Sequence, residues 1–280
     1  MDAFNGHRAV FNFRVDVDHF YPPHVMPLLE LAEKYDVKMS WYVTADAASR
    51  YPDFVKRLAQ SQDVQSHSYV HRTYETENEN RENMERAHKF FAGIGVDVEG
   101  FAAPFGKWNQ SVTTAAEKMG YAYTSEFIEG NRIFPFFPEI GNRKSSVLQI
   151  PVHGISEGNL FDRGYNKAQV NEYFSKIVDY FYANSIPIFI YGHPEERLGR
   201  HPDILESIFM KIRQKEDVLH TTLTDYADFW IKEKPTAPKA NYEANIFLED
   251  HSNFLTPLMR KISLKSFYLK DALYARGIKF

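Results

Sequence analysis

Residues 10–18 read VFNFRVDVD, a run in which apolar and polar side chains alternate from Phe11 onwards. Successive side chains of a β-strand point to opposite faces, so this pattern predicts a strand with one apolar and one polar face. The apolar face carries Phe11, Phe13, Val15 and Val17, and the polar face carries Asn12, Arg14, Asp16 and Asp18. Because the apolar face is bulky along its whole length, we expect a central strand of a sheet.

Strand-like and helix-like segments alternate along most of the remaining chain. Strand patterns lie at 37–44, 64–66, 100–103, 121–125, 147–152, 188–191 and 218–221, and helix patterns lie at 25–35, 52–60, 77–91, 109–119, 166–184, 204–215 and 224–231. Such alternation predicts a parallel sheet in an α/β protein. Seven or eight strand–helix units over residues 1–233 favour a (β/α) barrel, which takes about 250 residues, and the alternative is an open doubly wound sheet.

Composition restricts the chemistry that the chain can perform. Its 280 residues include 11 His and no Cys, and 33 Lys+Arg against 37 Asp+Glu give a formal charge of −4. The absence of Cys excludes disulfides, thiol nucleophiles and thiolate metal sites, so any metal must be held by His and carboxylate side chains. The near-neutral charge argues against a nucleic-acid partner, because nucleic-acid-binding proteins are usually basic.

The two ends of the sequence lead to separate expectations. The N-terminus has no basic region followed by an apolar run, and no apolar run approaches the ~20 residues that span a bilayer. We therefore expect a cytoplasmic protein. Residues 234–280 form a predicted extension, in which six basic residues and one acidic residue between 256 and 280 give +5. This basic, aromatic segment is either a helix packed on the barrel or a peripheral contact with the anionic inner face of a membrane or with a partner.

Two short motifs carry residues that can bind a metal. His67 and His71 are four residues apart, which places both imidazoles on one face of a helical turn and suits a divalent ion. Asp16 and Asp18 share the polar face of the first strand and lie at its C-terminal end. In a barrel the C-terminal ends of the strands form the active site, so these four side chains are expected to converge. Later strands bring Pro104, Phe105, His153 and His193 to the same end.

Four motifs in this order resemble those of the polysaccharide deacetylases, carbohydrate esterase family 4. Asp16-Val17-Asp18 resembles a spaced form of the first motif, and His67-Ser68-Tyr69-Val70-His71 matches the His-[Ser/Thr]-x-x-His metal motif. Ala102-Ala103-Pro104-Phe105-Gly106 resembles Arg-x-Pro-[Tyr/Phe]-Gly, and Tyr191-Gly192-His193 resembles Leu-x-His. The resemblance covers about residues 9–230 and implies an irregular (β/α)7-8 barrel, to which the basic C-terminal helical extension would be added.

The resemblance also implies roles for individual residues. Asp18, His67 and His71 would hold a divalent metal, for which Zn²⁺ is the first choice and Co, Fe or Ni also suit the ligands. Asp16 would be the general base and His193 the general acid. The backbone N–H of Phe105 would stabilise the oxyanion together with the metal. Pro104, Tyr191, His153 and Trp108 complete the expected substrate-binding residues.

The sequence departs from the family pattern at three places. Ala102 replaces the motif arginine that orients the base, and we predict that Arg14, on the same strand face as Asp16, substitutes for it. Tyr191 replaces a leucine of the acyl pocket, which either narrows the pocket towards a formyl group or adds a hydrogen bond. No Asp-x-x-Asp-Trp motif is present, and His153, found in that region, either touches substrate or packs in the core.

These observations lead to one principal functional hypothesis and two alternatives. The first is a metal-dependent hydrolase that removes an N-acyl group, acetyl or formyl, from a small-molecule amino sugar. A nucleotide- or lipid-linked precursor of a surface polysaccharide such as O-antigen would suit a cytoplasmic enzyme. The alternatives are a catalytically weak carbohydrate-binding relative, suggested by Ala102, and a hydrolase of a non-sugar amide or cyclic amide. The oligomeric state is not predicted.

Overall fold

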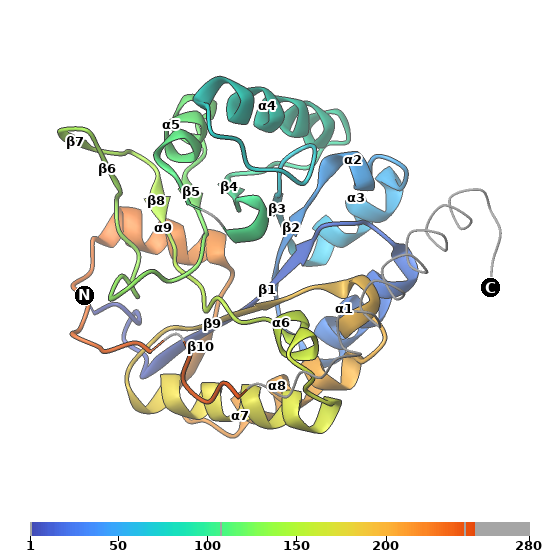
Figure 1. Ribbon diagram of the computed structural model, residues 1–280, viewed down its shortest axis with the longest axis vertical. Coiled ribbons are helices and arrows are strands. Elements are labelled where there is room, and N and C mark those ends of the chain that lie inside the picture. The colour runs from blue at the N-terminus through green and yellow to red at the C-terminus, as the bar shows by residue number, and fades with distance from the viewer. Residues whose placement is uncertain (1, 107, 244, 250–280) are drawn as a thin grey trace.

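A computed structural model describes residues 2–106, 108–243 and 245–249, and within them one curled parallel sheet dominates (Figure 1). Its hydrogen-bonded order is β10-β1-β2-β3-β4-β5-β8, and β9 also pairs with β1. The strands are β1 (Ala9–Val17), β2 (Ser40–Val43), β3 (Asp63–Ser66), β4 (Gly100–Phe101), β5 (Tyr123–Thr124), β8 (Leu148–Gln149), β9 (Ile188–Gly192) and β10 (Val218–His220). Helices cover the outside of this sheet, so the fold is the predicted irregular (β/α) barrel.

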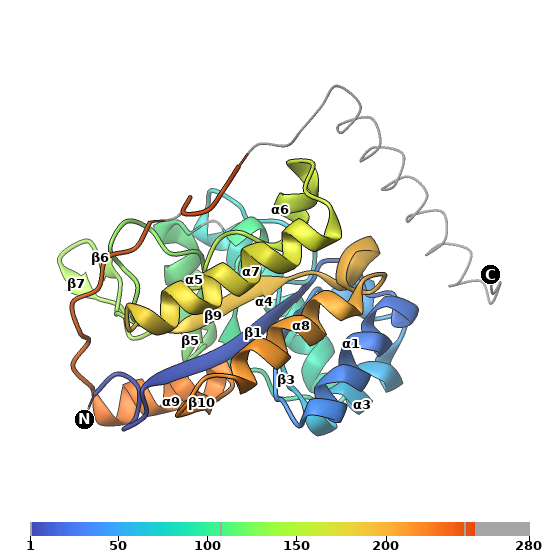
Figure 2. The same cartoon turned by 90° about the horizontal axis from the view of Figure 1, so that it is seen from below.

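The first strand is the centre of the sheet, as the alternating pattern predicts. All nine residues of β1 are buried, and the strand pairs in parallel with β2, β9 and β10. Phe11 on its apolar face packs against Phe209 of α8 (Pro202–Arg213), with ring centroids 6.4 Å apart. Figure 2 shows β1 and β9 running side by side between α7 and α8. The polar face of β1 therefore points into the barrel.

Two of the longer helices begin where capping residues predict. Asn109 accepts a hydrogen bond from the N–H of Val112 at the start of α5 (Gln110–Met119), and Gly120 ends this helix at φ 77°. Asn166 and Gln169 form a capping box at the start of α7 (Lys167–Ala183). The other long helices are α1 (Pro22–Tyr35), α3 (Pro52–Ser61), α4 (Glu77–Gly93) and α9 (Leu223–Glu233).

Several short elements are absent from the sequence prediction. They are α2 (Ala45–Ala48), α6 (Glu157–Asp162), the 3₁₀ turn η1 (Pro104–Gly106), the π-turn η2 (Pro194–Leu198) and the hairpin of β6 (Glu139–Ile140) with β7 (Arg143–Lys144). The strands β4, β5, β8 and β10 are also shorter than predicted, whereas β9 extends one residue further. The strands β8 and β9 do not pair with each other in the described sheet. Near them, the N–H of His153 donates to the carbonyl of Phe189 at 2.8 Å. This bond joins the two sides of the irregular barrel.

Residues that follow α9 pack along the barrel as far as they are described. Lys234 ends the helix in the left-handed region at φ 47°. The Tyr180 hydroxyl then donates to the carbonyl of Asn241 at 3.2 Å, and the N–H of Glu249 donates to the Tyr165 hydroxyl at 2.6 Å. The predicted basic helix within 250–280 lies outside the described residues. No helix in the described part has both the length and the apolar character needed to cross a membrane.

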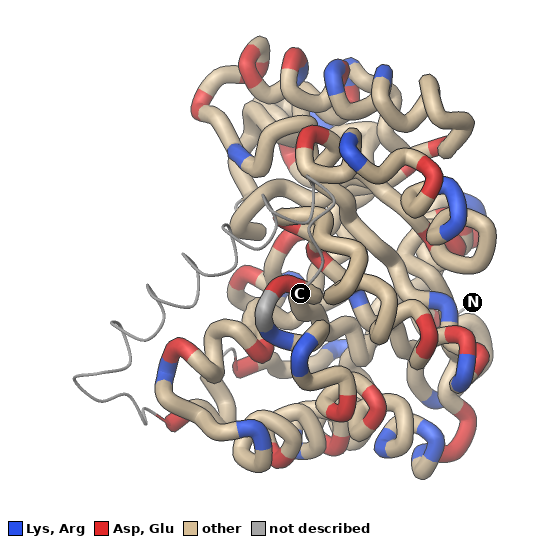
Figure 3. Tube along the Cα trace, turned by 90° about the vertical axis from the view of Figure 1, so that its right-hand side faces the viewer, with Lys and Arg blue, Asp and Glu red and all other residues tan. Residues whose placement is uncertain are grey.

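Charged side chains of both signs are mixed over the surface of the barrel. Figure 3 shows Lys and Arg interspersed with Asp and Glu along the exposed helices of one side. This distribution agrees with the near-neutral net charge of −4.

Candidate active site

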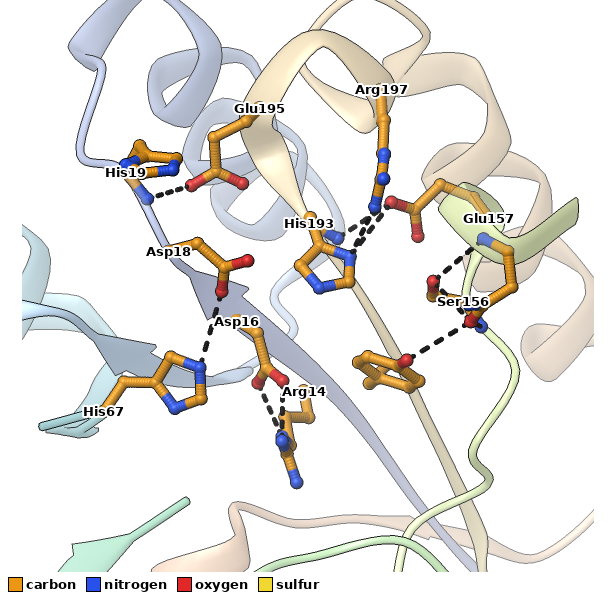
Figure 4. Close-up of polar contacts among 12 residues, drawn as sticks. Arg14, Asp16, Asp18, His19, His67, Ser156, Glu157, His193, Glu195 and Arg197 are labelled. Atoms are coloured by element: carbon orange, nitrogen blue, oxygen red, sulfur yellow. Dashed lines mark hydrogen bonds and ion pairs between the residues drawn. The ribbon is translucent and has the colours of Figure 1, made fainter. Parts of the chain in front are cut away.

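The C-terminal ends of β1, β3 and β9 bring the predicted side chains together. Asp16 is the penultimate residue of β1, Asp18 directly follows this strand, and His67 directly follows β3. The register pairs Val15 with Gly192, which places His193 level with Asp16 on the neighbouring strand. Figure 4 shows Asp18 between His67 and His193, with Asp16 and Arg14 below them. The barrel geometry therefore gathers these groups from segments far apart in the sequence.

Asp18, His67 and His71 form a cluster with the dimensions of a metal site. The Oδ1 atom of Asp18 lies 3.4 Å from Nε2 of His67 and 3.1 Å from Nε2 of His71. One ligand atom from each residue lies within 4.8 Å of the others. Ligand atoms ~2.0–2.1 Å from a tetrahedral ion stand ~3.3 Å apart, so the observed separations fit one bound cation.

The hydrogen bonding of His67 supports this assignment. Its Nδ1 lies 2.8 Å from the carbonyl oxygen of Ala102, which can only accept, so Nδ1 carries the proton. In the neutral ring Nε2 then presents a lone pair towards the carboxylate of Asp18, whose buried Oδ1 has no hydrogen-bond partner among the described residues. Two lone pairs in contact repel each other unless a cation lies between them, and a divalent metal ion would fill that place. A bond from Nδ1 to a backbone carbonyl such as that of Ala102 is typical of a metal-ligating histidine.

The local structure at His67 and His71 corrects one prediction. These residues do not lie on a helical turn, because residues 67–71 form a loop in which Ser68 has φ 72°. Asn83 of α4 fixes the loop: its side chain accepts from the N–H of Val70 and donates to the carbonyl of Val70, both at 2.9 Å. The rings still converge, with centroids 5.0 Å apart. Tertiary contacts thus replace helical geometry in bringing the two imidazoles together.

Arg14 and Asp16 form a buried bidentate ion pair. Nε and Nη2 of Arg14 each donate to one carboxylate oxygen of Asp16 at 2.6 Å, and the arginine side chain is fully buried. The guanidinium also lies over the ring of Tyr42, 5.1 Å from its centroid. Burial raises the pKa of Asp16, but the charge and hydrogen bonds of Arg14 outweigh it and hold that pKa below its ordinary value. This is the contact that we predicted for Arg14 because Ala102 lacks a charged side chain.

His193 contacts a buried carboxylate that the sequence analysis did not identify. Glu157, at the first position of α6, is fully buried; its Oε1 accepts from the N–H of His193 at 2.9 Å and lies 3.5 Å from Nδ1 of the same residue. A Cβ on Gly192 would come within 2.3 Å of Glu157 Oε2, so this glycine permits the close approach. Nη1 of Arg197 approaches the same ring nitrogen, 3.2 Å from His193 Nδ1 (Figure 4).

The charges around His193 determine its protonation. Burial and, to a smaller extent, the charge of Arg197 lower the pKa of His193, but the Glu157 contact and the charge of Asp18 outweigh them and raise it to about 9. A protonated imidazole at neutral pH is the form required of a general acid.

Glu195 is a second acidic residue, half-buried, that the sequence analysis did not identify. Its Oε1 accepts from the N–H of His19 at 2.8 Å, on the side of Asp18 away from His67 (Figure 4). Burial and the charge of Asp18 raise the pKa of Glu195 well above its ordinary value. A lone glutamate in the segment after a strand gives no sequence signal, so only the fold identifies either Glu157 or Glu195.

Pro104–Gly106 form a tight turn beside the metal cluster. Phe105 adopts φ 65° and ψ 12°, a left-handed conformation that costs a non-glycine residue roughly 1–2 kcal/mol. Its ring is 62% exposed and lies 4.7 Å from the ring of His71. The Thr73 hydroxyl donates to the carbonyl of Pro104 at 3.0 Å. Such strain persists only where neighbouring groups hold it, and it concentrates at functional sites.

Three residues predicted to bind substrate have other contacts in the structure. The Tyr191 hydroxyl donates to Asn159 at 3.3 Å, and the Trp108 indole donates to Thr113 at 2.8 Å. His153 is fully buried, with both ring nitrogens 2.9 Å from a tyrosine hydroxyl, those of Tyr173 and Tyr242. Burial lowers the pKa of His153 to about 3. This geometry favours packing as the role of His153.

Comparison with known proteins supports the family assignment. A sequence model of the polysaccharide deacetylase family matches residues 15–124. A search of the curated proteins gives no significant match. Among solved structures, a putative polysaccharide deacetylase from Mycobacterium smegmatis is 17% identical with a TM-score of 0.71, covering 85% of this chain and 95% of that one.

Two further structures share the fold. The Puue allantoinase is 17% identical with a TM-score of 0.69, covering 82% of this chain and 92% of that one. A carbohydrate esterase family 4 pseudoenzyme from Bacillus anthracis is 15% identical with a TM-score of 0.56, covering 80% of this chain and 66% of that one. The match to the family sequence model begins at Val15 and ends at Thr124. It therefore spans the first half of the barrel, including Asp16, Asp18 and both predicted histidine ligands. Residues 15–124 therefore resemble the polysaccharide deacetylase family, and the fold of the chain is the one that these solved structures share.

Proposed function

We propose that this protein is a metal-dependent hydrolase that removes an acetyl or formyl group from the nitrogen of an amino sugar. The observation that carries this proposal is the juxtaposition of the Asp18–His67–His71 cluster with the Asp16–Arg14 pair and with His193. A metal cluster, a carboxylate kept ionised and an imidazole kept protonated are the parts that amide hydrolysis requires.

Asp18, His67 and His71 would hold the metal, for which Zn²⁺ suits the ligands best. The bound ion would supply a Lewis acid that lowers the pKa of a water molecule and polarises the acyl carbonyl. Asp16 takes a proton from the attacking water, and Arg14 keeps this carboxylate ionised and fixed in orientation. Both oxygens of Asp16 accept a hydrogen bond from Arg14. The proton from the water is therefore accepted by a lone pair of the carboxylate that is not engaged with Arg14.

His193 donates the proton that the departing amine needs. An amide nitrogen leaves poorly unless it is protonated, and Glu157 stabilises the imidazolium that supplies the proton. The backbone N–H of Phe105 stabilises the oxyanion that forms at the acyl carbon. The strained conformation of Phe105 supports this role because it directs the peptide group away from regular secondary structure.

The proposed substrate is a small amino sugar carried on a nucleotide or a polyprenyl phosphate, as in the assembly of surface polysaccharides. Tyr191 supports an acyl group of limited size, since its ring stands where the family motif has leucine. Its hydroxyl donates to Asn159, and its ring lies against that of Phe127, with the centroids 4.9 Å apart. A formyl group fits such a restricted pocket at least as well as an acetyl group.

Hydrolysis of a cyclic amide is the second candidate. The fold shared with an allantoinase supports it, since ring opening of a cyclic amide uses the same base and acid. A pseudoenzyme is less well supported, because Arg14 replaces the charge that Ala102 lacks.

Release of acetate or formate tests these possibilities. The chain is stripped with a chelator, reloaded with Zn²⁺ and assayed against N-acetyl and N-formyl hexosamines, both free and linked to UDP or to a polyprenyl phosphate, with allantoin in parallel. We expect one acyl sugar to be hydrolysed and Asp16→Asn to lose ~10²–10⁴-fold in kcat. Binding of sugar without turnover, or turnover of allantoin alone, would overturn the principal proposal.

A further inference from the structure

Three consecutive residues after β5 contact three separate parts of the site. The carbonyl and the hydroxyl of Ser125 accept from Nη1 of Arg14, the latter at 3.2 Å. Oε1 of Glu126 accepts from the N–H of Ala103 at 3.1 Å. The ring of Phe127 lies against Gly106 and Tyr191. Residues 125–127, which we call the β5 segment, thus touch the arginine of the base, the start of the Pro104–Gly106 turn and the strand of the acid.

Glu126 is an unusual residue for a purely structural contact. Its side chain is fully buried, and its Oε2 atom has no hydrogen-bond partner among the described residues. Burial raises its pKa to about 7, partly opposed by Thr124 and Arg14. A buried carboxyl group with an unsatisfied oxygen destabilises the fold, so its presence is explained best by the backbone group that it holds.

The backbone group that Glu126 holds controls the orientation of the turn. Pro104 has no N–H, so Ala103 offers the last backbone donor before Phe105. The N–H of Ala103 donates to Glu126, and its carbonyl accepts from the N–H of Gly106 at 2.9 Å, which closes the turn. Both backbone groups of Ala103 are thus engaged, and the carbonyl of Pro104, in the same peptide as the N–H of Phe105, accepts from Thr73. Together these bonds leave that peptide little freedom to rotate.

The other end of the turn is held by the next residue of the β5 segment. A Cβ on Gly106 would come within 2.3 Å of the Phe127 ring, so the ring lies directly on the backbone of this glycine, which has φ 59°. One strand end therefore fixes both the entry and the exit of the left-handed turn at Phe105.

We propose that Glu126 is a positioning residue that holds the Pro104–Gly106 turn so that the N–H of Phe105 points at the developing oxyanion. The proposal rests on the proposed function for its catalytic consequence. Glu126 acts through Ala103, and the contact requires only an acceptor oxygen at this position. A glutamine therefore preserves the contact, whereas an alanine removes it.

The test compares Glu126→Ala with Glu126→Gln in the Zn²⁺-loaded full chain. With the acyl sugar that the wild type hydrolyses fastest, we expect Glu126→Ala to lose about 10–100-fold in kcat with KM within about threefold, as expected when a transition-state contact is lost. Glu126→Gln should remain within about threefold of the wild type. Val178→Ala, at a buried position of α7 outside the site, is the control for general destabilisation and should keep its kcat.

Amide hydrogen exchange provides a readout that does not depend on turnover. Exchange at Ala103, Phe105 and Gly106 should accelerate at least tenfold in Glu126→Ala and stay near the wild-type rate in Glu126→Gln and Val178→Ala. Unchanged exchange in Glu126→Ala, or faster exchange with unaltered kcat, would overturn the positioning role. A wild-type chain without turnover would count against the proposed function alone, since the exchange rates would still decide whether Glu126 holds the turn.

Discussion

At the residue scale, alternation along β1 accounts for the central charge arrangement of the site. Arg14 and Asp16 are two residues apart, so both point into the barrel and can pair in plane. The sequence pattern therefore predicted this ion pair from local geometry. Glu157, Glu126 and Glu195 could not be predicted in the same way, because each meets its partner through a contact between distant segments.

Substitution of Arg14 tests the role of that pair. In Arg14→Ala the carboxylate of Asp16 stays buried without its counter-charge, so its pKa rises and the unfolding free energy falls by roughly 3–5 kcal/mol. A base acts only when ionised, so the acidic limb of the pH–kcat profile should move to higher pH. Arg14→Lys keeps the charge without the bidentate geometry and should give an intermediate shift. An unaltered acidic limb and kcat in Arg14→Ala would show that Arg14 has no part in the reaction.

The basic limb of the same profile tests His193. Its pKa is raised to about 9, so the imidazolium persists below that value and kcat should fall as the pH rises through about 9. Glu157→Gln removes the carboxylate that stabilises the charged ring, so the limb should move to lower pH. Glu206→Gln alters an exposed pair between α8 and Lys34 far from the site and serves as a control with an unchanged profile. A basic limb that stays in place in Glu157→Gln would contradict the assignment of the acid.

At the element scale, the sequence predicted those helices and turns that neighbouring residues determine. It did not predict those that depend on contacts between distant segments. The capped helices α5 and α7 were found from Asn109 and Asn166, because an N-cap acts within four residues. The turn η1 and the loop after β3 were not predicted, because Phe105 and Ser68 adopt left-handed conformations that only their surroundings impose. For His67 and His71 the spacing predicted that the two rings would meet, although the helical turn that it predicted is wrong.

Asn83 should therefore control metal binding without touching the metal. Its side chain bonds to both backbone groups of Val70 and, at 3.1 Å, to the carbonyl of Arg72. Asn83→Ala should weaken Zn²⁺ binding about 10–100-fold, the usual effect of losing a group that orients a ligand, as measured by competition with a chromogenic chelator. Glu85→Ala, an exposed change on the same helix, is the control. Equal affinities in the two variants would show that the loop is rigid without Asn83.

At the scale of the whole molecule, the barrel explains why distant motifs meet. Strand–helix alternation predicted a parallel sheet, and the rule that sites form at the C-terminal strand ends placed Asp18, His67 and His193 together. The irregular side of the barrel was not predictable, since β5 and β8 have two residues each and the contact to β9 relies on His153. The packing of His153 also removes a predicted substrate contact from the site.

Metal binding should stabilise this assembly as a unit. A ligand that binds only the folded state at 100 times its Kd adds about 2.7 kcal/mol to the unfolding free energy. Excess Zn²⁺ should therefore raise the thermal midpoint of the chelator-treated chain, measured by circular dichroism, and Asp18→Asn should abolish most of the increase. An equal increase in Asp18→Asn would indicate that Zn²⁺ binds elsewhere.

The central claim is that Asp18, His67 and His71 hold one divalent metal beside Asp16 and His193. The most direct measurement is a crystal structure of the Zn²⁺-loaded chain with anomalous data collected across the zinc edge. The claim predicts one strong anomalous peak ~2.0–2.2 Å from a carboxylate oxygen of Asp18 and from Nε2 of both histidines. A fully loaded protein with its zinc peak away from these three atoms would contradict it.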